Sequence, residues 1–575
     1  MRRVLSICAA LVACSALWAC SDTTATSLNS LADATPGAAA GDADGAADAA
    51  HEVQTDGPAD AATAMDADTH EQASADSGAQ ADGGAETAAD IAADIAADTA
   101  SDAPADSGSD APSDSADAAS GIVDLGPDQP LGTLVSGAAG PCVEVAPFQA
   151  PDCATVKCPA GAVCLAGGVC APQAGFYADD AGPADQAWPA VAAREDGHFA
   201  VAWSAGSYFD AGLQIKVRVF GASGQPLSAT LAVSPAPGPG LAMHFAPSVA
   251  AMADGSWLLL WRSELQAQST AAYFVQQVAA DGSALIGAPA QINATPLGLA
   301  TGSSNIIQPV LVRLRNDRLM AAWVGNPQSG GGPTVWARLI NPDGTPLTGE
   351  LDTGATAGPA SSPAIAALTG GQALLVWEAT MPGKGPQLIR GRVFAEGGVP
   401  ASAVLDLSPG AKPYEALPAV AGYPNGETLL MFKAGDTVGS TDKVDIRGRK
   451  LAAAWPQTPQ SGVTAGLPKI LDTDPTGTYP GAAPAVLLSA DRALAVWHNP
   501  GQPPYGIWGR RHWREADAWD CQLLDLGGPQ LVGEQGSRVL PAAAAWNNGR
   551  VAVVWTAQLS GGTNPSRIAV RLLGL

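Results

Sequence analysis

The segment PAVAAREDGHFAVAW, residues 189–203, decides how this chain folds, because it returns six more times with variations. Each copy has a proline, a short apolar run, a turn that often reads Asp-Gly or Asn-Gly, and a second apolar run with an aromatic residue. Alternating apolar residues on both sides of such a turn predict a β-hairpin. The leading prolines are Pro189, Pro247, Pro309, Pro363, Pro418, Pro484 and Pro541. The aromatic residues follow fourteen positions later, or thirteen in the sixth copy, and are Trp203, Trp261, Trp323, Trp377, Phe432, Trp497 and Trp555.

A third and a fourth strand complete each copy. After a variable loop most copies have Ile or Val, two further residues and an Arg, and a Gly-containing turn then leads to a short apolar run. The third-strand arginines are Arg218, Arg338, Arg392, Arg449, Arg510 and Arg571, and Gln276 stands at this place in the second copy. All-β repeats of roughly 55 to 65 residues are typical of radial arrays. We therefore predict an all-β fold, a seven-bladed β-propeller of four-stranded antiparallel blades over residues 175–575.

The last copy ends at Leu575, directly after its third strand. A missing fourth strand would leave an open sheet edge. Residues 175–178, which precede the first proline at about the spacing of the other fourth strands, are expected to complete the last blade. The recurring Trp is expected to close the core between blades, and the recurring Arg to lie against it or to pair with a carboxylate.

The N-terminus carries an export signal. Arg2 and Arg3 precede an apolar run that is too short to span a membrane, and residues 1–19 are expected to be a signal peptide. The stretch Leu17-Trp18-Ala19-Cys20 resembles a bacterial lipobox, which implies that Cys20 is the lipid attachment site. Ser21 implies outer-membrane sorting, by similarity to the rule for enterobacterial lipoproteins, with the protein facing the periplasm or the cell surface. The alternative is an ordinary secretory signal that contains cysteines.

Residues 20–140 are expected to be a disordered tether rich in Ala and Asp. Between Leu31 and Ser120 there are 21 acidic residues and no Lys or Arg, and no aromatic residue occurs from Ser21 to Pro147. Such a segment buries too little apolar surface to offset its conformational entropy. The tether supplies most of the net charge of −26, so the acidic balance describes the spacer and argues against a nucleic-acid partner.

Residues 141–174 are expected to form a small disulfide-rich segment. Its four close cysteines have an EGF-like spacing of the kind found in extracytoplasmic proteins, where disulfides are favoured. Zinc is the competing interpretation, but Cys-x-x-Cys pairs and a nearby His are missing. The expected pairs are Cys153–Cys164 and Cys158–Cys170, with Cys142 and Cys521 left to join the cluster to the region after Arg510.

Function is expected where the copies differ, on the face that carries the long loops. Polar residues placed just past the second strand and in these loops suit a polar ligand such as a glycan or a peptide. Solvated loop tips are the alternative. The candidates are Tyr208, Asp210, Arg262, Glu378, Tyr414, Lys433, Tyr479, His498 and Tyr505.

The motifs of common enzymes are missing. The chain has no His-Glu-x-x-His, no Gly-x-Ser-x-Gly and no Walker loop, and the Asp-boxes of sialidases do not match. His198, His244 and His512 are scattered, with no partner suggested by spacing. We therefore predict no catalytic residue, no cofactor and no metal, and we expect a monomer.

The repeat pattern Pro-x-Val-Ala, Asp-Gly, Val-x-Trp, Ile-x-x-Arg is similar to a repeat of large bacterial surface and secreted proteins. With the lipobox, the Ala/Asp tether and the cysteine cluster, the chain resembles the envelope lipoproteins of myxobacteria and their relatives. The resemblance implies no catalytic residues. We expect a lipid-anchored binding or scaffolding module for a glycan, peptide or protein partner. The alternative is a glycan-acting hydrolase or lyase with its site on the variable-loop face.

Overall fold

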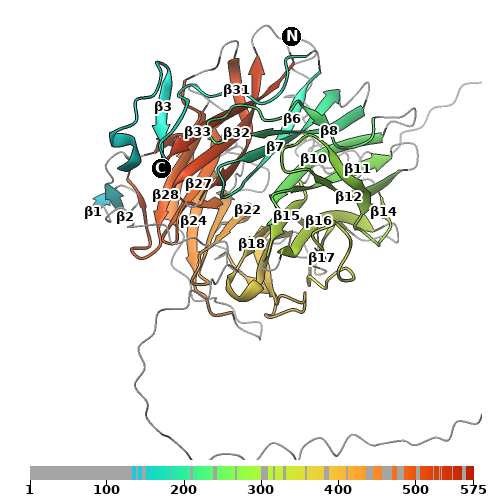
Figure 1. Ribbon diagram of the computed structural model, residues 1–575. Helices are drawn as coiled ribbons and strands as arrows, with labels where there is room; N and C mark the ends of the chain where they lie inside the picture. The colour runs from blue at the N-terminus through green and yellow to red at the C-terminus, as the bar shows by residue number, and fades with distance from the viewer. Residues whose placement is uncertain are drawn as a thin grey trace, which may run out of the picture. The chain divides into compact units, whose positions relative to one another are not determined.

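The computed structural model shows that the described part of the chain is built of β-strands, with only short 3-10 turns besides (Figure 1). It describes residues 133–137, 140–144, 151–182, 184–207, 212–236, 242–265, 269–298, 308–314, 317–327, 332–355, 359–380, 387–408, 412–435, 444–455, 469–474, 485–499, 506–521, 523–529, 531, 534–546, 548–559 and 565–575. The predicted signal peptide, Cys20 and most of the predicted tether lie outside these residues. Among the described residues, no helix has the length and hydrophobicity needed to cross a membrane.

The repeats form antiparallel strands in chain order, each hairpin joined at its predicted turn. The first two copies hold β6 (Gln186–Ala193), β7 (Phe199–Ser207), β8 (Gly212–Phe220) and β9 (Leu231–Ala232), then β10 (Ala242–Ala251), β11 (Trp257–Leu265), β12 (Thr270–Val278), β13 (Leu285–Gln291) and β14 (Leu297–Gly298). The next two hold β15 (Val310–Arg313), β16 (Leu319–Pro327) and β17 (Thr334–Ile340), then β18 (Ala360–Ala367), a 3-10 turn (Thr369–Gly371), β19 (Ala373–Thr380), β20 (Gln387–Phe394) and β21 (Leu405–Asp406).

The remaining copies continue the pattern. The fifth holds β22 (Tyr414–Gly422), β23 (Thr428–Gly435), β24 (Val444–Leu451) and β25 (Lys469–Asp474). The sixth holds β26 (Ala485–Leu487), β27 (Arg492–Asn499), β28 (Gly506–Trp513), β29 (Ala518–Asp520) and β30 (Leu524–Asp525). The last holds β31 (Glu534–Ala545), β32 (Arg550–Leu559) and β33 (Arg567–Gly574).

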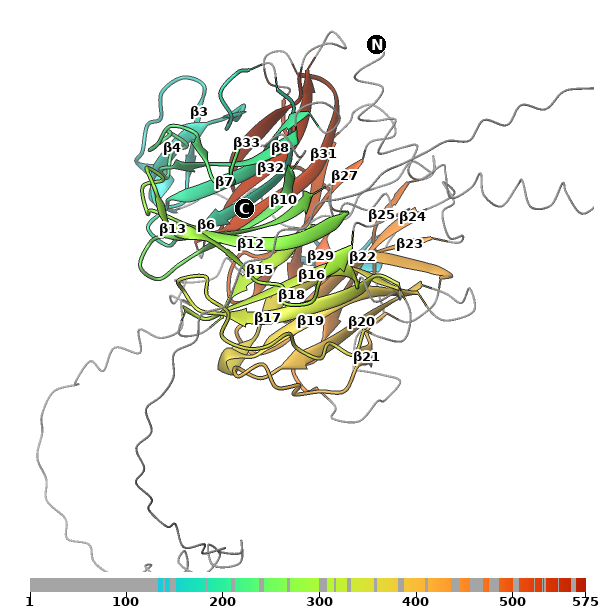
Figure 2. The same ribbon diagram turned by 90° about the vertical axis from the view of Figure 1, so that its right-hand side faces the viewer.

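The first strands of successive copies contact one another in a closed cycle. The order is β6, β10, β15, β18, β22, β26 and β31, and β31 contacts β6 again. Figures 1 and 2 show these strands following one another around a centre. Antiparallel sheets placed side by side in a cycle are the arrangement of a β-propeller.

In five copies the repeated proline lies inside the first strand, not at its start as the sequence predicts, whereas Pro309 directly precedes β15 and Pro484 lies outside the described residues. In five copies the residue before this proline has a φ between 51° and 55°, and where both flanks are described the pairing register shifts there. This is a β-bulge, a position in a sheet that tolerates proline because the missing N–H is not needed for the ladder. The bulge residues are Trp188, Ala246, Ser362, Leu417 and Leu540.

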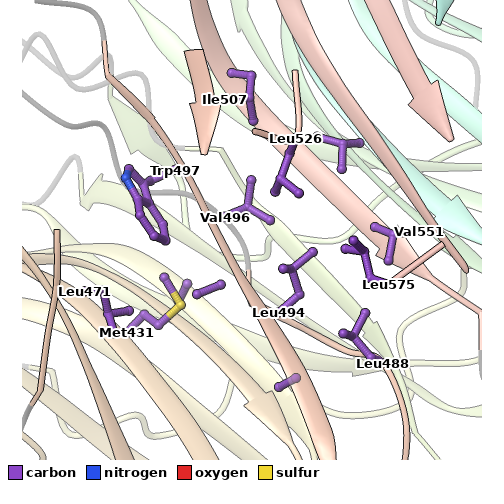
Figure 3. Packing of buried hydrophobic residues seen from close by; sticks show 14 of the residues in the cluster. Met431, Leu471, Leu488, Leu494, Val496, Trp497, Ile507, Leu526, Val551 and Leu575 are labelled. Carbon is purple, nitrogen blue, oxygen red and sulfur yellow. The ribbon is translucent and has the colours of Figure 1, made fainter. Parts of the chain in front are cut away.

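The second-strand aromatic residues are buried between sheets, as predicted. None of the seven side chains is more than 1% exposed. Figure 3 shows Trp497 beside Met431 and Val496, within a cluster that joins strands of the last three copies. Because replacing such a residue by Ala costs about 3–5 kcal/mol, these side chains supply much of the cohesion between neighbouring sheets.

The repeated arginine pairs with a carboxylate in two copies, as predicted, because Arg218 contacts Asp180 at 3.0 Å and Arg392 contacts Asp352 at 3.3 Å. Its guanidinium also donates to backbone carbonyls, which the sequence does not predict. Arg338 donates to the carbonyl of Ile292 at 2.5 Å, and Arg449 donates to that of Leu407 at 2.7 Å. Both acceptors belong to the preceding copy, so these arginines join their sheet to the one before it. Arg218, Arg392 and Arg571 repeat the contact with Ala178, Asp352 and Asp525.

The predicted closure is present in the structure. Strand β5 (Phe176–Tyr177) pairs antiparallel with β33, and so supplies the outer strand of the last sheet. Gly175, with φ +85°, approaches the carbonyl of Val570 so closely that a Cβ would lie 2.4 Å from its oxygen. Next to β5, the Asp179 carboxylate accepts from the Arg567 guanidinium at 2.9 Å and from the Ile568 backbone N–H at 2.8 Å. Strand β5 and strand β33, which are far apart in the sequence, are thus joined by both backbone and side-chain hydrogen bonds.

The N-terminal cysteines form the expected pairs, Cys153–Cys164, Cys158–Cys170 and Cys142–Cys521. A 3-10 turn (Pro151–Ala154) precedes the hairpin of β3 (Ala162–Leu165) and β4 (Val169–Pro172), whose Leu165 and Ala171 pack on the core next to β33. Strand β1 (Thr133–Gly137) lies inside the range 20–140 that the sequence assigns to the tether. It pairs with β2 (Gly140–Glu144), which lies parallel to β29 beside the third disulfide.

We expect Asp179→Asn to weaken the closure strongly, because it leaves the Arg567 guanidinium without its buried anion. The free energy of unfolding should fall by about 3 kcal/mol in urea titrations. Asp180→Asn is the matched control, since Asp180 pairs with Arg218 while its side chain is 66% exposed. In Asp180→Asn the free energy of unfolding should fall by less than about 1 kcal/mol. Equal losses in the two variants would contradict this role for Asp179.

Candidate functional site

The predicted ligand-face residues divide into two groups. Tyr208, Asp210, Tyr479 and Tyr505 lie outside the described residues. Arg262, Glu378, Tyr414, Lys433 and His498 are described. The site is therefore built from the second group and the residues around it.

Four of these five residues lie within second strands and not beyond them. Arg262 in β11, Glu378 in β19, Lys433 in β23 and His498 in β27 directly follow the aromatic residue, and they are only 2% to 7% exposed. The sequence predicts that they lie past the strand end, exposed among the loops. In three of these copies the first strand stays paired with the second beyond the bulge, and in the sixth copy His498 is paired with Ile507 of β28.

We name this place in each copy the post-aromatic position. Every side chain there is buried, whatever its chemistry, and the residues are Ser204, Arg262, Val324, Glu378, Lys433, His498 and Thr556. The side chain can reach the bulge of the next copy. The Ser204 hydroxyl accepts from the Ala246 backbone N–H at 3.1 Å, and a Glu378 carboxylate oxygen lies 3.4 Å from the Leu417 backbone N–H. One structural position thus carries different polar groups against a constant backbone.

Glu378, Lys433 and His498 occupy this position in three consecutive copies, and they interact electrostatically. Burial raises the pKa of the Glu378 carboxyl, while hydrogen bonds from Leu417 and Ser362 and the charge of Lys433 act in the opposite direction. Burial lowers the pKa of Lys433 to about 8 against the opposing effect of Glu378. Burial and the Lys433 charge together lower the pKa of His498 to about 4. At pH 7 His498 is therefore neutral.

Lys433 also lines a small pocket. Its Nζ lies 5.5 Å from the centre of the Tyr414 ring, a cation–π contact with the remaining predicted residue. The pocket has room for about one water molecule, and its other walls are apolar. They are formed by Leu417, Met431, Phe432, Ile446, Val496 and Trp497. A buried amine in apolar surroundings is the main chemical feature of this site.

Arg262 belongs to a separate cluster. Its guanidinium contacts the Glu264 carboxylate at 2.6 Å and the Tyr273 hydroxyl at 3.2 Å, and that hydroxyl donates to the carbonyl of Val324. All the side chains of this cluster are paired and buried, so Arg262 links two copies of the repeat. Sequence reasoning missed Glu264, although it lies two residues after Arg262 and therefore on the same face of the strand.

Sequence reasoning also missed a buried chain of hydrogen bonds at His512. The Tyr423 hydroxyl lies 2.7 Å from His512 Nδ1, and His512 Nε2 lies 3.1 Å from an Asp517 carboxylate oxygen. Tyr423 and His512 are 89 residues apart, so their spacing holds no signal for the contact. Both are almost fully buried and connect the fifth copy to the sixth. In the described part of the chain no group of three or more metal-ligating residues comes together.

Comparisons with protein-family models and with curated proteins found no match. A protein of unknown function from Dyadobacter fermentans is similar in structure, at 15% identity and TM-score 0.39 over 58% of this chain and 94% of that one. An α-L-arabinanase from Penicillium chrysogenum, in complex with arabinobiose, is 14% identical with TM-score 0.37 over 57% and 93%. A sialidase from Streptococcus pneumoniae is 12% identical with TM-score 0.37 over 70% of each chain. Similarities this weak say nothing about the chemistry of this chain.

We expect His498 to make the free energy of unfolding depend on pH in the acidic range. Since its folded pKa is about 4 and an unfolded His titrates near 6.5, the unfolded chain binds more protons between these values. His498 therefore lowers the free energy of unfolding as the pH falls from about 6.5 to 4, by about 3 kcal/mol. His498→Gln should remove this part of the acid sensitivity in urea titrations at pH 4 to 7.

His244 provides an independent comparison, because burial alone lowers its pKa to about 4. His244→Gln should remove a similar part of the acid sensitivity, and the double variant should remove the contributions of both histidines. A His498→Gln protein that loses stability in acid as steeply as the parent would contradict the buried, neutral imidazole.

Proposed function

We propose that this chain is a lipid-anchored envelope protein whose seven-bladed propeller binds a glycan, peptide or protein partner. The observation that carries the proposal is the post-aromatic position. The bulge, the aromatic residue and the third-strand arginine recur from copy to copy and hold the sheets together. The neighbouring position instead changes from Ser204 through Glu378 and Lys433 to His498 and Thr556.

The fold does not need a polar residue at the post-aromatic position, because Val324 occupies it in the third copy. Taking a charged side chain out of water is unfavourable unless partners compensate. Buried titratable groups with shifted pKa values beside a pocket are typical of functional sites. Lys433 lines the pocket, and Glu378 and His498 interact with it electrostatically from the neighbouring copies. Together the three residues offer an acceptor, a cation and a neutral imidazole to a polar ligand.

A glycan-acting hydrolase is the second candidate, and the buried carboxylates favour binding over it. Such enzymes use two carboxyl groups that flank one bond and have separated pKa values. Here Glu264 contacts Arg262 at 2.6 Å, and Glu534 contacts Arg538 at 2.8 Å. Glu378 has Lys433, Ser362 and Leu417 as its neighbours. Each carboxylate is thus held by a cation or by hydrogen-bond donors.

The same proposal includes the location. Residues 17–20 support lipid attachment at Cys20, Ser21 supports sorting to the outer membrane, and three disulfides suit an oxidising compartment outside the cytoplasm. A lipid-modified cysteine carries enough acyl chain for stable anchoring. The propeller then acts as a monomer at the periplasmic or outer surface, without nucleic acid as a partner.

We expect Cys20→Ser to abolish fatty-acid incorporation and to move the protein from the membrane fraction to the soluble one. The measurement is metabolic labelling with a clickable fatty acid, followed by fractionation. Cys14→Ser is the matched control, because Leu11-Val12-Ala13-Cys14 has the same form as Leu17-Trp18-Ala19-Cys20 but leaves with the signal peptide. A labelled and membrane-bound Cys20→Ser protein would contradict the anchor.

We expect the full chain to bind at least one class of ligand on glycan, peptidoglycan and envelope-protein arrays. Glu378→Gln and His498→Gln should weaken that binding at least about tenfold, or by about 1.4 kcal/mol, since each removes a polar contact of the site. Thr556→Val is the matched control, at the same position of another copy. Either silence on all arrays or equal binding by the three variants would overturn the proposal.

A further inference from the structure

The Cys142–Cys521 disulfide joins two segments that are 379 residues apart in the chain. Cys142 lies in β2, on the side of the chain that leads back to Cys20, and Cys521 directly follows β29 of the sixth copy. The closing strand β5 comes later in the chain than Cys142 and completes the last sheet. The disulfide therefore links the tether side of the chain to the sixth copy by a path that does not include the closure.

The segment that precedes Cys521 is held inside the sixth copy. Trp519 is buried, and its ring lies 4.7 Å from the ring of His512. The Asp520 carboxylate accepts from the Arg511 guanidinium at 2.8 Å, and both side chains are buried. Because Cys521 also lies in the middle of the chain, a pull on it has to extract these buried groups before the sixth copy can unfold.

The other end of the disulfide is in contact with the same copy. Val143, next to Cys142, is buried and packs against Trp513 and Ala518. The backbone N–H of Cys521 donates to the carbonyl of Val143 at 3.0 Å, where β2 lies parallel to β29. The disulfide thus lies beside a packed and hydrogen-bonded contact, in a place where it can transmit tension.

The closure, in contrast, depends on a short strand. Strand β5 is two residues long, and its Phe176 and Tyr177 are only partly buried. Next to it, the Ala178 backbone N–H and the Asp179 carboxylate add hydrogen bonds to β33. A typical hydrogen bond contributes only about 1 kcal/mol, and a pull on the end of a strand breaks such bonds one after another. Tension that entered the propeller through β5 would therefore open the cycle at this place.

We infer that the Cys142–Cys521 disulfide is a mechanical latch, which passes tension from the tether into the sixth copy and keeps it away from the closing strand. This inference rests on the proposed function, in which the chain is anchored at Cys20 and holds a partner on the propeller. When membrane and partner move apart, the tension reaches Cys142 first and crosses the S–S bond to Cys521. The chain from Val143 to Asp179, which includes β5, is then free of tension, and the cycle stays closed. An oxidising compartment keeps the latch formed.

The test is to pull on single molecules of the full chain between two attachment points. One point is an azide-bearing amino acid at Val399 in the fourth copy, whose side chain is 66% exposed. The other is the same amino acid placed either at Ser120, before the latch, or at Gln173, an exposed residue between the latch and β5. Tension applied at Ser120 should cross the disulfide, whereas tension applied at Gln173 enters β5 directly. The force of the first rupture should be at least about twofold higher for Ser120, since hydrogen bonds alone resist the pull at Gln173.

Removal of the latch provides the second readout. In the double variant Cys142→Ser, Cys521→Ser, tension applied at Ser120 has to pass through β5, so the rupture force should fall to the value for Gln173 in the parent. The double variant Cys158→Ser, Cys170→Ser is the matched control. Its missing disulfide lies in the stretch of chain that the latch bypasses, so the rupture force for Ser120 should equal that of the parent.

The comparison of the two attachment points uses the parent with all three disulfides, so it does not depend on how the cysteine variants fold. Equal rupture forces for Ser120 and Gln173 in the parent would overturn the inference. A rupture force for Ser120 that is unchanged in a folded variant without the Cys142–Cys521 disulfide would also overturn it. Pulling needs neither lipid nor ligand, so its failure and a failure of the proposed anchor or ligand binding are observed separately.

Discussion

Both faces of the central strands in this chain are apolar, and this constraint determines the rest of the structure. In β11, β19, β23 and β32 almost every residue is buried, although successive side chains point to opposite faces. A sheet of this kind is stable only when another sheet covers each face. A linear stack would leave two faces uncovered, and a closed cycle leaves none. The last sheet must then find its outer strand elsewhere, and β5 supplies it.

The same constraint explains why polar groups lie between sheets. Strand residues point alternately to the two faces, so the residue after each aromatic side chain points to the opposite face, toward the neighbouring copy. Serine and glutamate at that place meet backbone donors, and valine can replace them. The fold therefore tolerates different side chains at the post-aromatic position of each copy, close to the bulges of the next sheet. The polar groups at this position can differ between copies while the apolar core stays the same.

The repeat, the all-β class, the closing strand and the cysteine pairs could be predicted because each depends on local pattern or on counting. The carbonyl acceptors of the arginines could not be predicted, because a backbone carbonyl such as that of Leu407 leaves no mark in the sequence. The proline position was misjudged for a similar reason. A proline after a polar loop is typical of a strand start, and only the register of the partner strand reveals that Pro418 follows a bulge at Leu417.

The candidate site was predicted by residue but not by environment. Selecting polar residues beside a repeated aromatic residue found Glu378, Lys433 and His498, yet it placed them past the second strands on the loop face, whereas they are buried within these strands. Their pKa shifts depend on burial and on neighbours about 55 and 65 residues away in the chain, and these neighbours meet only across two different contacts between sheets. The electrostatic effects of Lys433 on Glu378 and on His498 therefore last only while the fourth, fifth and sixth sheets remain packed.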